Sequence, residues 1–293
     1  MKKIIVTGAS GFIGSNLIPY LLKKKIKILS ISKRNINLKN IICVKCNISS
    51  IDKKKEIINK FNADTIVHLA WHGIPNLNEQ NSRKSLKESK NFFKKILKIS
   101  KVKRIISLGS CLEYLIHSGE KKESDSLNVK NPFSRSKNDL RIFLEKTCKA
   151  NKISLAWLRV FYIYGKNQRR KSIINFIIKH LKLRKKKIKF KNPFLHNDYI
   201  FINDFNKLIY KIINKNKFFG TFNVGYSKGY SPIKIFNIIK KLLKNKYCNV
   251  GEPIKITTKT NSFISNIKKT KNIFNWNPEY SMSKGIKAIL IKK

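Results

Sequence analysis

The chain has 293 residues, of which 42% are hydrophobic, so it is long enough to bury a large core. No apolar run reaches the roughly 18 to 20 residues that would span a bilayer. The formal net charge of +50 comes from 65 Lys and Arg against 15 Asp and Glu. Because the excess is mostly Lys, spread from end to end together with abundant Asn, Ile and Phe, a codon bias toward A and T explains it more simply than a nucleic-acid site. We therefore expect a soluble protein with no specific nucleic-acid or membrane partner.

The five cysteines are scattered and odd in number. This usage fits a reducing compartment better than a disulfide framework, so we expect a cytoplasmic protein. Cys43 and Cys46 form a C-x-x-C pair, yet no second Cys or His pair completes a tetrahedral site. We therefore expect no metal.

Strands and helices alternate over the first 165 residues. The expected strands are residues 3–7, 27–32, 41–46, 65–70, 104–108 and 155–163. The expected helices are residues 12–22, 51–61, 86–99 and 136–150. Because this alternation is typical of a parallel sheet covered on both faces, the sequence predicts a doubly wound α/β domain, a Rossmann fold, over residues 1–165.

The alternation weakens after residue 165, where a smaller α+β substrate-binding lobe is expected to begin and to continue to residue 293. The helices expected there are 172–183, 204–214, 232–243 and a last one after a turn at 275–278. Short strands are expected near residues 188 and 199 and over 221–224. We expect part of 198–225 to return to the first sheet.

Three glycines, spaced three residues apart, mark the junction between the first strand and the first helix. Gly8 would permit a tight turn, Gly11 would let backbone N–H groups approach a pyrophosphate, and Gly14 would permit close packing of helix on strand. The positive end of the helix dipole would then face the phosphates. This context predicts a dinucleotide site that includes Gly8, Ser10, Gly11, Phe12, Ile13 and Gly14.

The end of the second strand bears on the choice of cofactor. A site that prefers NAD usually has an acidic residue about 20 residues after the glycines, where it binds the ribose 2′-hydroxyl. This chain instead has Ser32-Lys33-Arg34 there. Since arginine can hold a 2′-phosphate with two hydrogen bonds, we expect NADP(H) to be preferred, with NAD(H) as the alternative.

Several short motifs, in a consistent order, resemble the extended short-chain dehydrogenase/reductase family, in its NAD-dependent epimerase/dehydratase group acting on sugar nucleotides. The likeness covers nearly the whole chain. The motifs are residues 6–14, 68–71, 109–114, 132–137, 158–165, 198–204, 222–225 and 276–278. By this resemblance the cofactor would also meet Ser32, Arg34, Asn47, Ile48, Leu69, Ala70, Lys137 and Phe161.

Within that family, residues 69–76, 109–114 and 157–168 look most like reductases of CDP- or dTDP-linked 4-keto-6-deoxy sugars. The resemblance implies hydride transfer from a nicotinamide to a sugar C4 ketone, yielding a deoxyhexose for surface polysaccharide; epimerisation is the other reaction of the group. It also implies a homodimer that pairs the helices at 86–99 and 136–150. Asn197 stands where the family often has Arg, and Asn47 where an Asp commonly meets the adenine.

The family's catalytic triad is a Ser or Thr, a Tyr and a Lys. Ser110 and Lys137 match the first and third, but Phe133 occupies the tyrosine position. A benzyl side chain cannot donate a proton, and general acid catalysis typically contributes about 10² to 10⁴ in rate. Three readings stay open. Tyr114, Ser110 or a water could be the donor; the substrate could need no acid; or the protein could be a cofactor-binding homologue that acts as a binding or regulatory module.

Overall fold

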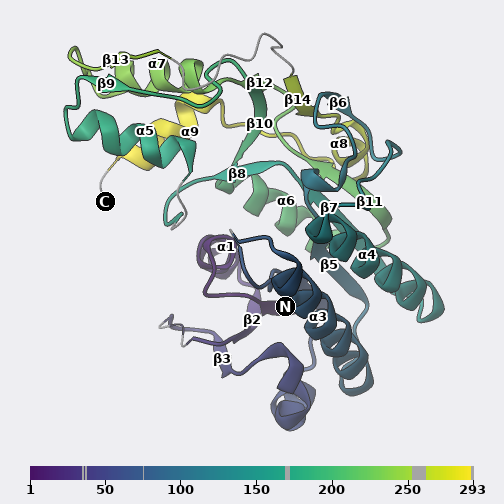
Figure 1. The fold of residues 1–293 in the computed structure, drawn as a ribbon. Coiled ribbons are helices and arrows are strands. Elements are labelled where there is room, and N and C mark those ends of the chain that lie inside the picture. Colours follow the sequence, from purple (N-terminus) through teal and green to yellow (C-terminus); the bar gives the residue numbers. More distant parts are fainter. Residues whose placement is uncertain (35, 37, 75, 169–171, 253–261, 292–293) are drawn as a thin grey trace.

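The computed structural model describes residues 1–34, 36, 38–74, 76–168, 172–252 and 262–291 (Figure 1). Pro75, in the motif at 69–76, lies outside these residues. The central element is a seven-stranded sheet in the order β11-β7-β5-β4-β1-β2-β3, in which all the neighbouring strands run parallel. Its strands are β1 (Lys3–Thr7), β2 (Lys27–Ser32), β3 (Ile42–Lys45), β4 (Thr65–His68), β5 (Arg104–Leu108), β7 (Ser154–Val160) and β11 (Phe219–Val224). The expected doubly wound parallel sheet is confirmed.

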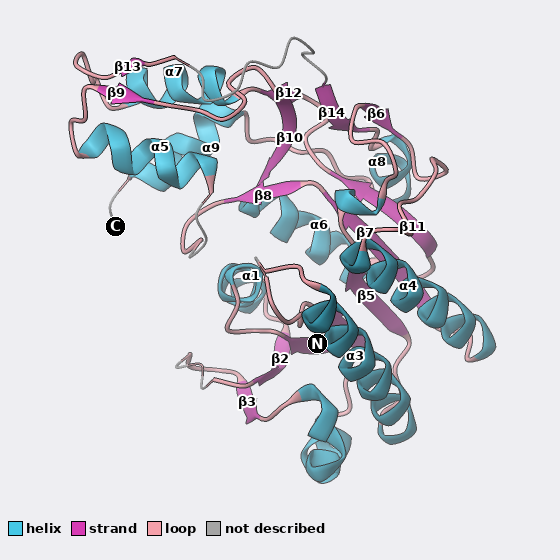
Figure 2. Ribbon diagram, viewed as in Figure 1, coloured by secondary structure: helices cyan, strands magenta, loops and turns pink. Residues whose placement is uncertain are grey.

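Helices cover both faces of this sheet, as Figure 2 shows. Because successive side chains of a strand point to opposite faces, Ile4 and Val6 of β1 pack into one hydrophobic cluster and Ile5 into the other. Complete burial of each such side chain contributes roughly 1.5–3 kcal/mol. The first cluster includes residues of α1 (Phe12–Lys23) and α6 (Ile202–Asn214). The second includes residues of η1 (Ile48–Lys54), α2 (Lys55–Phe61), α3 (Glu79–Ile99) and α4 (Pro132–Ala150).

The rest of the chain builds a second body beside the carboxyl ends of the central strands (Figure 1). A five-stranded sheet runs β12-β10-β14-β6, with β8 paired to β10. Its strands are β6 (Gly119–Lys121), β8 (Tyr162–Tyr164), β10 (His196–Phe201), β12 (Gly229–Tyr230) and β14 (Ser262–Ser265). Around it lie η2 (Cys111–Glu113), α5 (Ile173–Lys182), β9 (Lys187–Ile188), α7 (Pro232–Leu242), β13 (Asn249–Val250), α8 (Lys268–Phe274) and α9 (Met282–Leu290). Strand β11, which lies within residues 198–225, belongs to the central sheet and not to this second sheet.

Among the element boundaries that differ from the expected ones, three have clear local physical reasons. Helix α3 begins seven residues early because Asn78 caps it, accepting a hydrogen bond from Asn81 N. Helix α4 begins at Pro132, which is favoured in a first turn, after the cap Asn131. The strand expected over 155–163 is divided at Phe161, whose N–H donates to Val224 O. Among the described residues, no helix combines the length and apolar character needed to cross a bilayer.

Candidate cofactor pocket and active site

The glycine turn between β1 and α1 leaves no room for side chains at two of its positions. Gly8 has φ +67°, and a Cβ placed there would lie 2.7 Å from Ala70 N. A Cβ at Gly14 would lie 2.5 Å from Ala9 O. Both contacts are with backbone atoms, which cannot move aside as a flexible side chain can. The turn therefore requires glycine at both places, and it brings the start of α1 close to the end of β4.

The first turn of α1 is left open to a ligand. Gly11 is the N-cap residue and no side chain caps the helix. The amide groups of the first turn have no acceptor within the helix, and the helix dipole places partial positive charge on them. The glycine turn, which has no side chains at Gly8 and Gly14, and these amides together fit the pyrophosphate of a dinucleotide. When bound, such a cofactor would supply hydride chemistry that the protein's own side chains lack.

A cavity of about 270 Å³ opens in front of this turn. Nine of the residues predicted to meet the cofactor line it: Gly8, Ser10, Gly11, Ser32, Arg34, Asn47, Ile48, Leu69 and Ala70. Phe12, Ile13, Gly14, Lys137 and Phe161 are not in its lining. The first three belong to the opening turn of α1, where backbone groups rather than side chains would serve a phosphate. The cavity thus gathers the ends of four neighbouring strands, β1 to β4.

Sequence reasoning missed the residues that helix α3 contributes to this cavity. Ser85, Glu88 and Ser89 line it, together with Trp71 and His72 after β4. All three α3 residues are buried, although each is polar. Residues three and four positions apart lie on one face of a helix, as Ser85, Glu88 and Ser89 do. This spacing of polar residues in the sequence could have indicated that α3 turns a polar face toward a site.

The wall of the cavity at the ends of β2 and β4 is charged. Lys33 and Arg34 follow β2, and Lys33 Nζ lies 3.1 Å from His72 Nε2. The same imidazole nitrogen contacts Glu88 Oε2. Ser32 Oγ turns toward the next residues, accepting a hydrogen bond from Arg34 N at 3.2 Å. The sequence has no acidic residue between the end of β2 and Asp52, but a carboxylate reaches the same cavity from α3.

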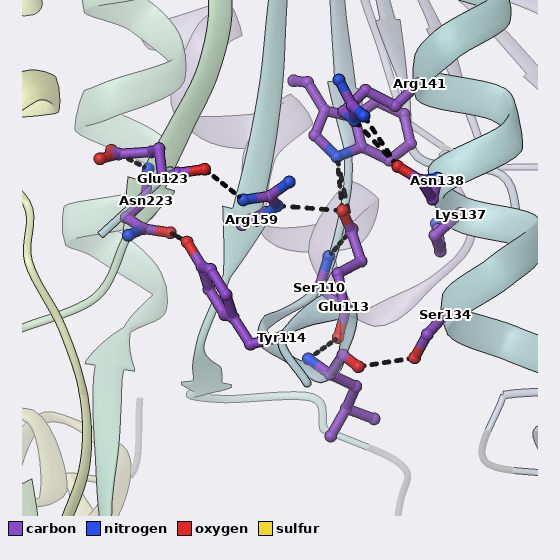
Figure 3. Close-up of polar contacts among 12 residues, drawn as sticks. Ser110, Glu113, Tyr114, Glu123, Ser134, Lys137, Asn138, Arg141, Arg159 and Asn223 are labelled. Atoms are coloured by element: carbon purple, nitrogen blue, oxygen red, sulfur yellow. Dashed lines mark hydrogen bonds and ion pairs between the residues drawn. The ribbon is translucent and has the colours of Figure 1, made fainter. Parts of the chain in front are cut away.

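Ser110 begins the tight turn after β5, and a buried ion pair fixes that turn (Figure 3). Its N–H donates to Glu113 Oε1 at 2.7 Å, and its Oγ accepts from Leu112 N at 3.2 Å. Glu113 Oε2 in turn accepts from Arg159 Nε at 3.1 Å and from Trp157 Nε1 at 3.1 Å. Because both charges are almost wholly buried, the pair holds the turn in one arrangement.

Lys137 lies buried on α4, between the end of β5 and Trp71. Its Nζ donates to Leu108 O at 2.7 Å and lies 3.6 Å from the centroid of the Trp71 ring, close enough for a cation–π contact. Burial lowers the pKa of Lys137 to about 7, and the nearby carboxylate of Glu113 opposes this effect. The ammonium group therefore loses a proton far more readily than a lysine in water.

Phe133, which occupies the tyrosine position, and Tyr114, a candidate for the substitute donor, both take structural positions. Phe133 is buried and packs edge-on against Trp71, with ring centroids 6.0 Å apart. The Tyr114 hydroxyl donates to Asn223 Oδ1 at 2.7 Å, and burial raises the pKa of its phenol to about 12. Figure 3 shows Tyr114 directed toward Asn223 rather than toward Lys137. Phe161 packs against Tyr114 and Phe263, with ring centroids 6.5 and 5.1 Å apart.

Comparisons with known proteins agree with this geometry. The sequence model of the NAD dependent epimerase/dehydratase family matches residues 4–225. A dTDP-6-deoxy-L-talose 4-dehydrogenase (NAD(+)) from Aggregatibacter actinomycetemcomitans is 26% identical over 60% of this chain and 67% of its own. The CDP-abequose synthase of Salmonella muenchen is 26% identical over 100% of this chain and 98% of its own.

A solved structure shares the fold. The dTDP-glucose 4,6-dehydratase of Bacillus anthracis str. Ames, in complex with NAD, superposes with a TM-score of 0.82 at 20% identity over 99% of this chain and 95% of that chain. The resemblance expected from the sequence motifs is confirmed, and so is the expectation of an enzyme. This chain belongs to the NAD dependent epimerase/dehydratase family and is an enzyme of that type.

Proposed function

We propose that the protein reduces a CDP- or dTDP-linked 4-keto-6-deoxyhexose, using NADP(H) in preference to NAD(H), to make a deoxyhexose for surface polysaccharide. The observation that carries this proposal is the open cavity at the glycine turn, lined by most of the residues predicted for a dinucleotide. Epimerisation of a nucleotide-linked sugar is the second reaction compatible with the same site.

The names of the relatives support the substrate class. One of the two relatives above is named for a dTDP-linked and the other for a CDP-linked sugar, and the CDP-abequose synthase matches this chain along its whole length. Each relative is 26% identical to this chain, which supports the class of substrate. The particular sugar and nucleotide are what we propose.

Two side chains of this protein would act on the ketone. When bound, the reduced nicotinamide supplies a hydride, whose electron pair goes to the C4 carbonyl carbon. The Ser110 hydroxyl would donate a hydrogen bond to the carbonyl oxygen as negative charge develops on it. Because Phe133 has no proton to give and the Tyr114 phenol is bonded to Asn223, the Lys137 ammonium is the proton source that we assign. The oxygen becomes a hydroxyl, and the neutral amine takes its proton back from solvent.

The charges after β2 support the cofactor preference. Lys33 and Arg34 line the cavity, and no acidic residue follows β2 to accept the 2′-hydroxyl of NAD. Arginine matches the geometry of a phosphate with two parallel N–H donors. The comparison of the dissociation constants of NADPH and NADH by fluorescence titration tests this preference directly.

Product analysis tests the function as a whole. Purified protein with NADPH should consume the cofactor when a dTDP- or CDP-linked 4-keto-6-deoxyhexose is added, and one deoxyhexose product should appear on chromatography. Cofactor consumption no faster than in the absence of the sugar would overturn the proposed reaction.

The non-catalytic alternative rests on Phe133 alone, and membership in an enzyme family does not favour it. Phe133→Tyr separates the two. A gain in turnover of about 10²-fold or more would mark an enzyme that has lost its acid, by the usual size of general acid catalysis. A substantial rate that stays unchanged would show that another donor already serves.

We also propose a homodimer through α3 and α4, which lie side by side along one face of the central sheet (Figure 2). Light scattering of the purified protein should give twice the 34.2 kDa mass of one chain. A monomeric mass at micromolar concentration would contradict the pairing.

A further inference from the structure

Glu88, on helix α3, is the single acidic side chain among the described residues that line the cofactor cavity. It lies more than 50 residues beyond the end of β2, where a sequence comparison looks for such a group. Its side chain is 11% exposed, so its carboxylate is held in place rather than free in solvent. The protein therefore does supply a carboxylate to the cavity, from a different element.

Two partners orient this carboxylate. Asn47 Nδ2, after β3, donates to Glu88 Oε1 at 3.3 Å, and His72 Nε2, after β4, contacts Glu88 Oε2. The Asn47 Oδ1 already accepts a hydrogen bond from Ser49 N. Because the Asn47 amide carries no charge, the anionic acceptor among the described residues that line the cavity is Glu88.

His72 links this carboxylate to the cationic side of the cavity. Its Nε2 lies 3.1 Å from Lys33 Nζ as well as against Glu88. One ring nitrogen either carries a proton or accepts one, so it cannot donate to Glu88 and accept from Lys33 together. When His72 Nε2 donates to Glu88, Lys33 Nζ keeps only its longer contact, 3.5 Å, with His72 Nδ1, and its other protons can bind a ligand.

We propose that Glu88 is the residue that limits the preference of this cavity for a 2′-phosphate. The proposal rests on the proposed use of a nicotinamide dinucleotide. A 2′-phosphate would gain from Lys33 and Arg34 but would be repelled by the Glu88 carboxylate in a partly buried site. A ribose 2′-hydroxyl carries no charge and can donate to a carboxylate. Glu88 thus opposes the two cations and keeps NAD(H) usable.

The test is the ratio of the dissociation constants of NADH and NADPH, measured by fluorescence titration at fixed ionic strength. Glu88→Gln keeps the size and the hydrogen-bonding capacity of the side chain but removes its charge. We expect this variant to shift the ratio toward NADPH by about tenfold or more, which corresponds to about 1.4 kcal/mol. Arg34→Gln should shift it in the opposite direction, because it removes a bidentate phosphate contact.

Two further variants make the result specific. Glu79→Gln removes a carboxylate from the exposed start of the same helix, where it pairs with Arg83 and Arg135, and should leave the ratio unchanged. His72→Leu, at a partly exposed position, removes the side chain that contacts the Glu88 carboxylate, leaves that carboxylate with one partner fewer, and should lower the affinity for NADPH. This second variant also allows the ratio of dissociation constants to be tested if Glu88→Gln does not fold.

The outcomes separate this inference from the proposed function. If both cofactors bind and neither the Glu88 nor the His72 variant changes the ratio by more than twofold, the role of Glu88 is wrong while the enzyme assignment stands. If the unaltered protein binds neither nucleotide, the proposed function itself fails.

Discussion

The two ends of the site are built differently. At the cofactor end, backbone groups define the geometry: Gly8 and Gly14 bring α1 against the ends of β1 and β4 so closely that a Cβ would collide with main chain. At the catalytic end, side chains define it, and Phe133, in the tyrosine position, packs against Trp71 but has no proton to donate. A site made of backbone can be recognised from glycine spacing, whereas a site made of side chains must be examined residue by residue.

We propose that Lys137, whose pKa is lowered, compensates at the catalytic end for the missing phenol. Trp71 and Phe133 surround the Lys137 ammonium, whose Nζ lies 3.6 and 5.9 Å from their ring centroids. Burial lowers the pKa of the group, because the charged form loses hydration there. In the mechanism that we propose, the aromatic surroundings that lack a phenol therefore favour the release of a proton by Lys137.

The largest expected effect is a loss of turnover at the catalytic end, with little change in cofactor binding. Lys137→Met should reduce turnover by about 10² to 10⁴, the usual contribution of general acid catalysis. Cofactor affinity, measured by titration, should fall only a few-fold, because Lys137 does not line the cavity. Lys146→Met, at an exposed position of the same helix, is the matched control and should change neither turnover nor cofactor affinity. Near-normal turnover in Lys137→Met would exclude the lysine as the proton source.

The next largest expected effect is a loss of cofactor affinity caused by a change in the glycine turn. Gly8→Ala forces a side chain onto a residue with φ +67° and into contact with Ala70 N. We expect NADPH affinity to fall by about 10²-fold, since the loss of several backbone contacts to the pyrophosphate costs nearly 3 kcal/mol. Gly119→Ala is matched in backbone angle, with φ +75°, but has nothing within 4 Å of the added Cβ. It should keep full affinity, and equal losses in both variants would show that strain, not the close approach, is responsible.

The same contrast explains what the sequence could predict. The central strands and the glycine turn followed from β-branched runs and from spacing, because these signals are local. The spacing of polar residues on α3 was a local signal as well, but the partners of Glu88 were not, since it meets Asn47 and His72 only after the sheet has brought distant segments together. The position of Tyr114 was equally hidden, because its partner Asn223 lies 109 residues away.

The pH dependence of reduction sharpens the assignment of Lys137. Its pKa of about 7 means that the proton needed for reduction is present below that pH and is lost above it. The turnover number should therefore be level below about pH 7 and fall about tenfold per unit above, as for any single required acid. Phe133→Tyr should move this fall to higher pH, because a phenol with an ordinary pKa near 10 would supply the proton. A turnover number of the unaltered protein that does not fall between pH 7 and pH 9 would contradict the role of the lysine.

The smallest expected effect concerns Tyr114. Tyr114→Phe removes the hydrogen bond to Asn223 Oδ1 in a fully buried position, so the free energy of unfolding should fall by about 1–3 kcal/mol. Turnover should stay within about threefold, a change well below the 10² expected for the loss of a general acid. Thermal unfolding and steady-state kinetics on one preparation measure both quantities. A variant that keeps its stability but loses a hundredfold in rate would transfer the proton-donating role from α4 to the turn after β5.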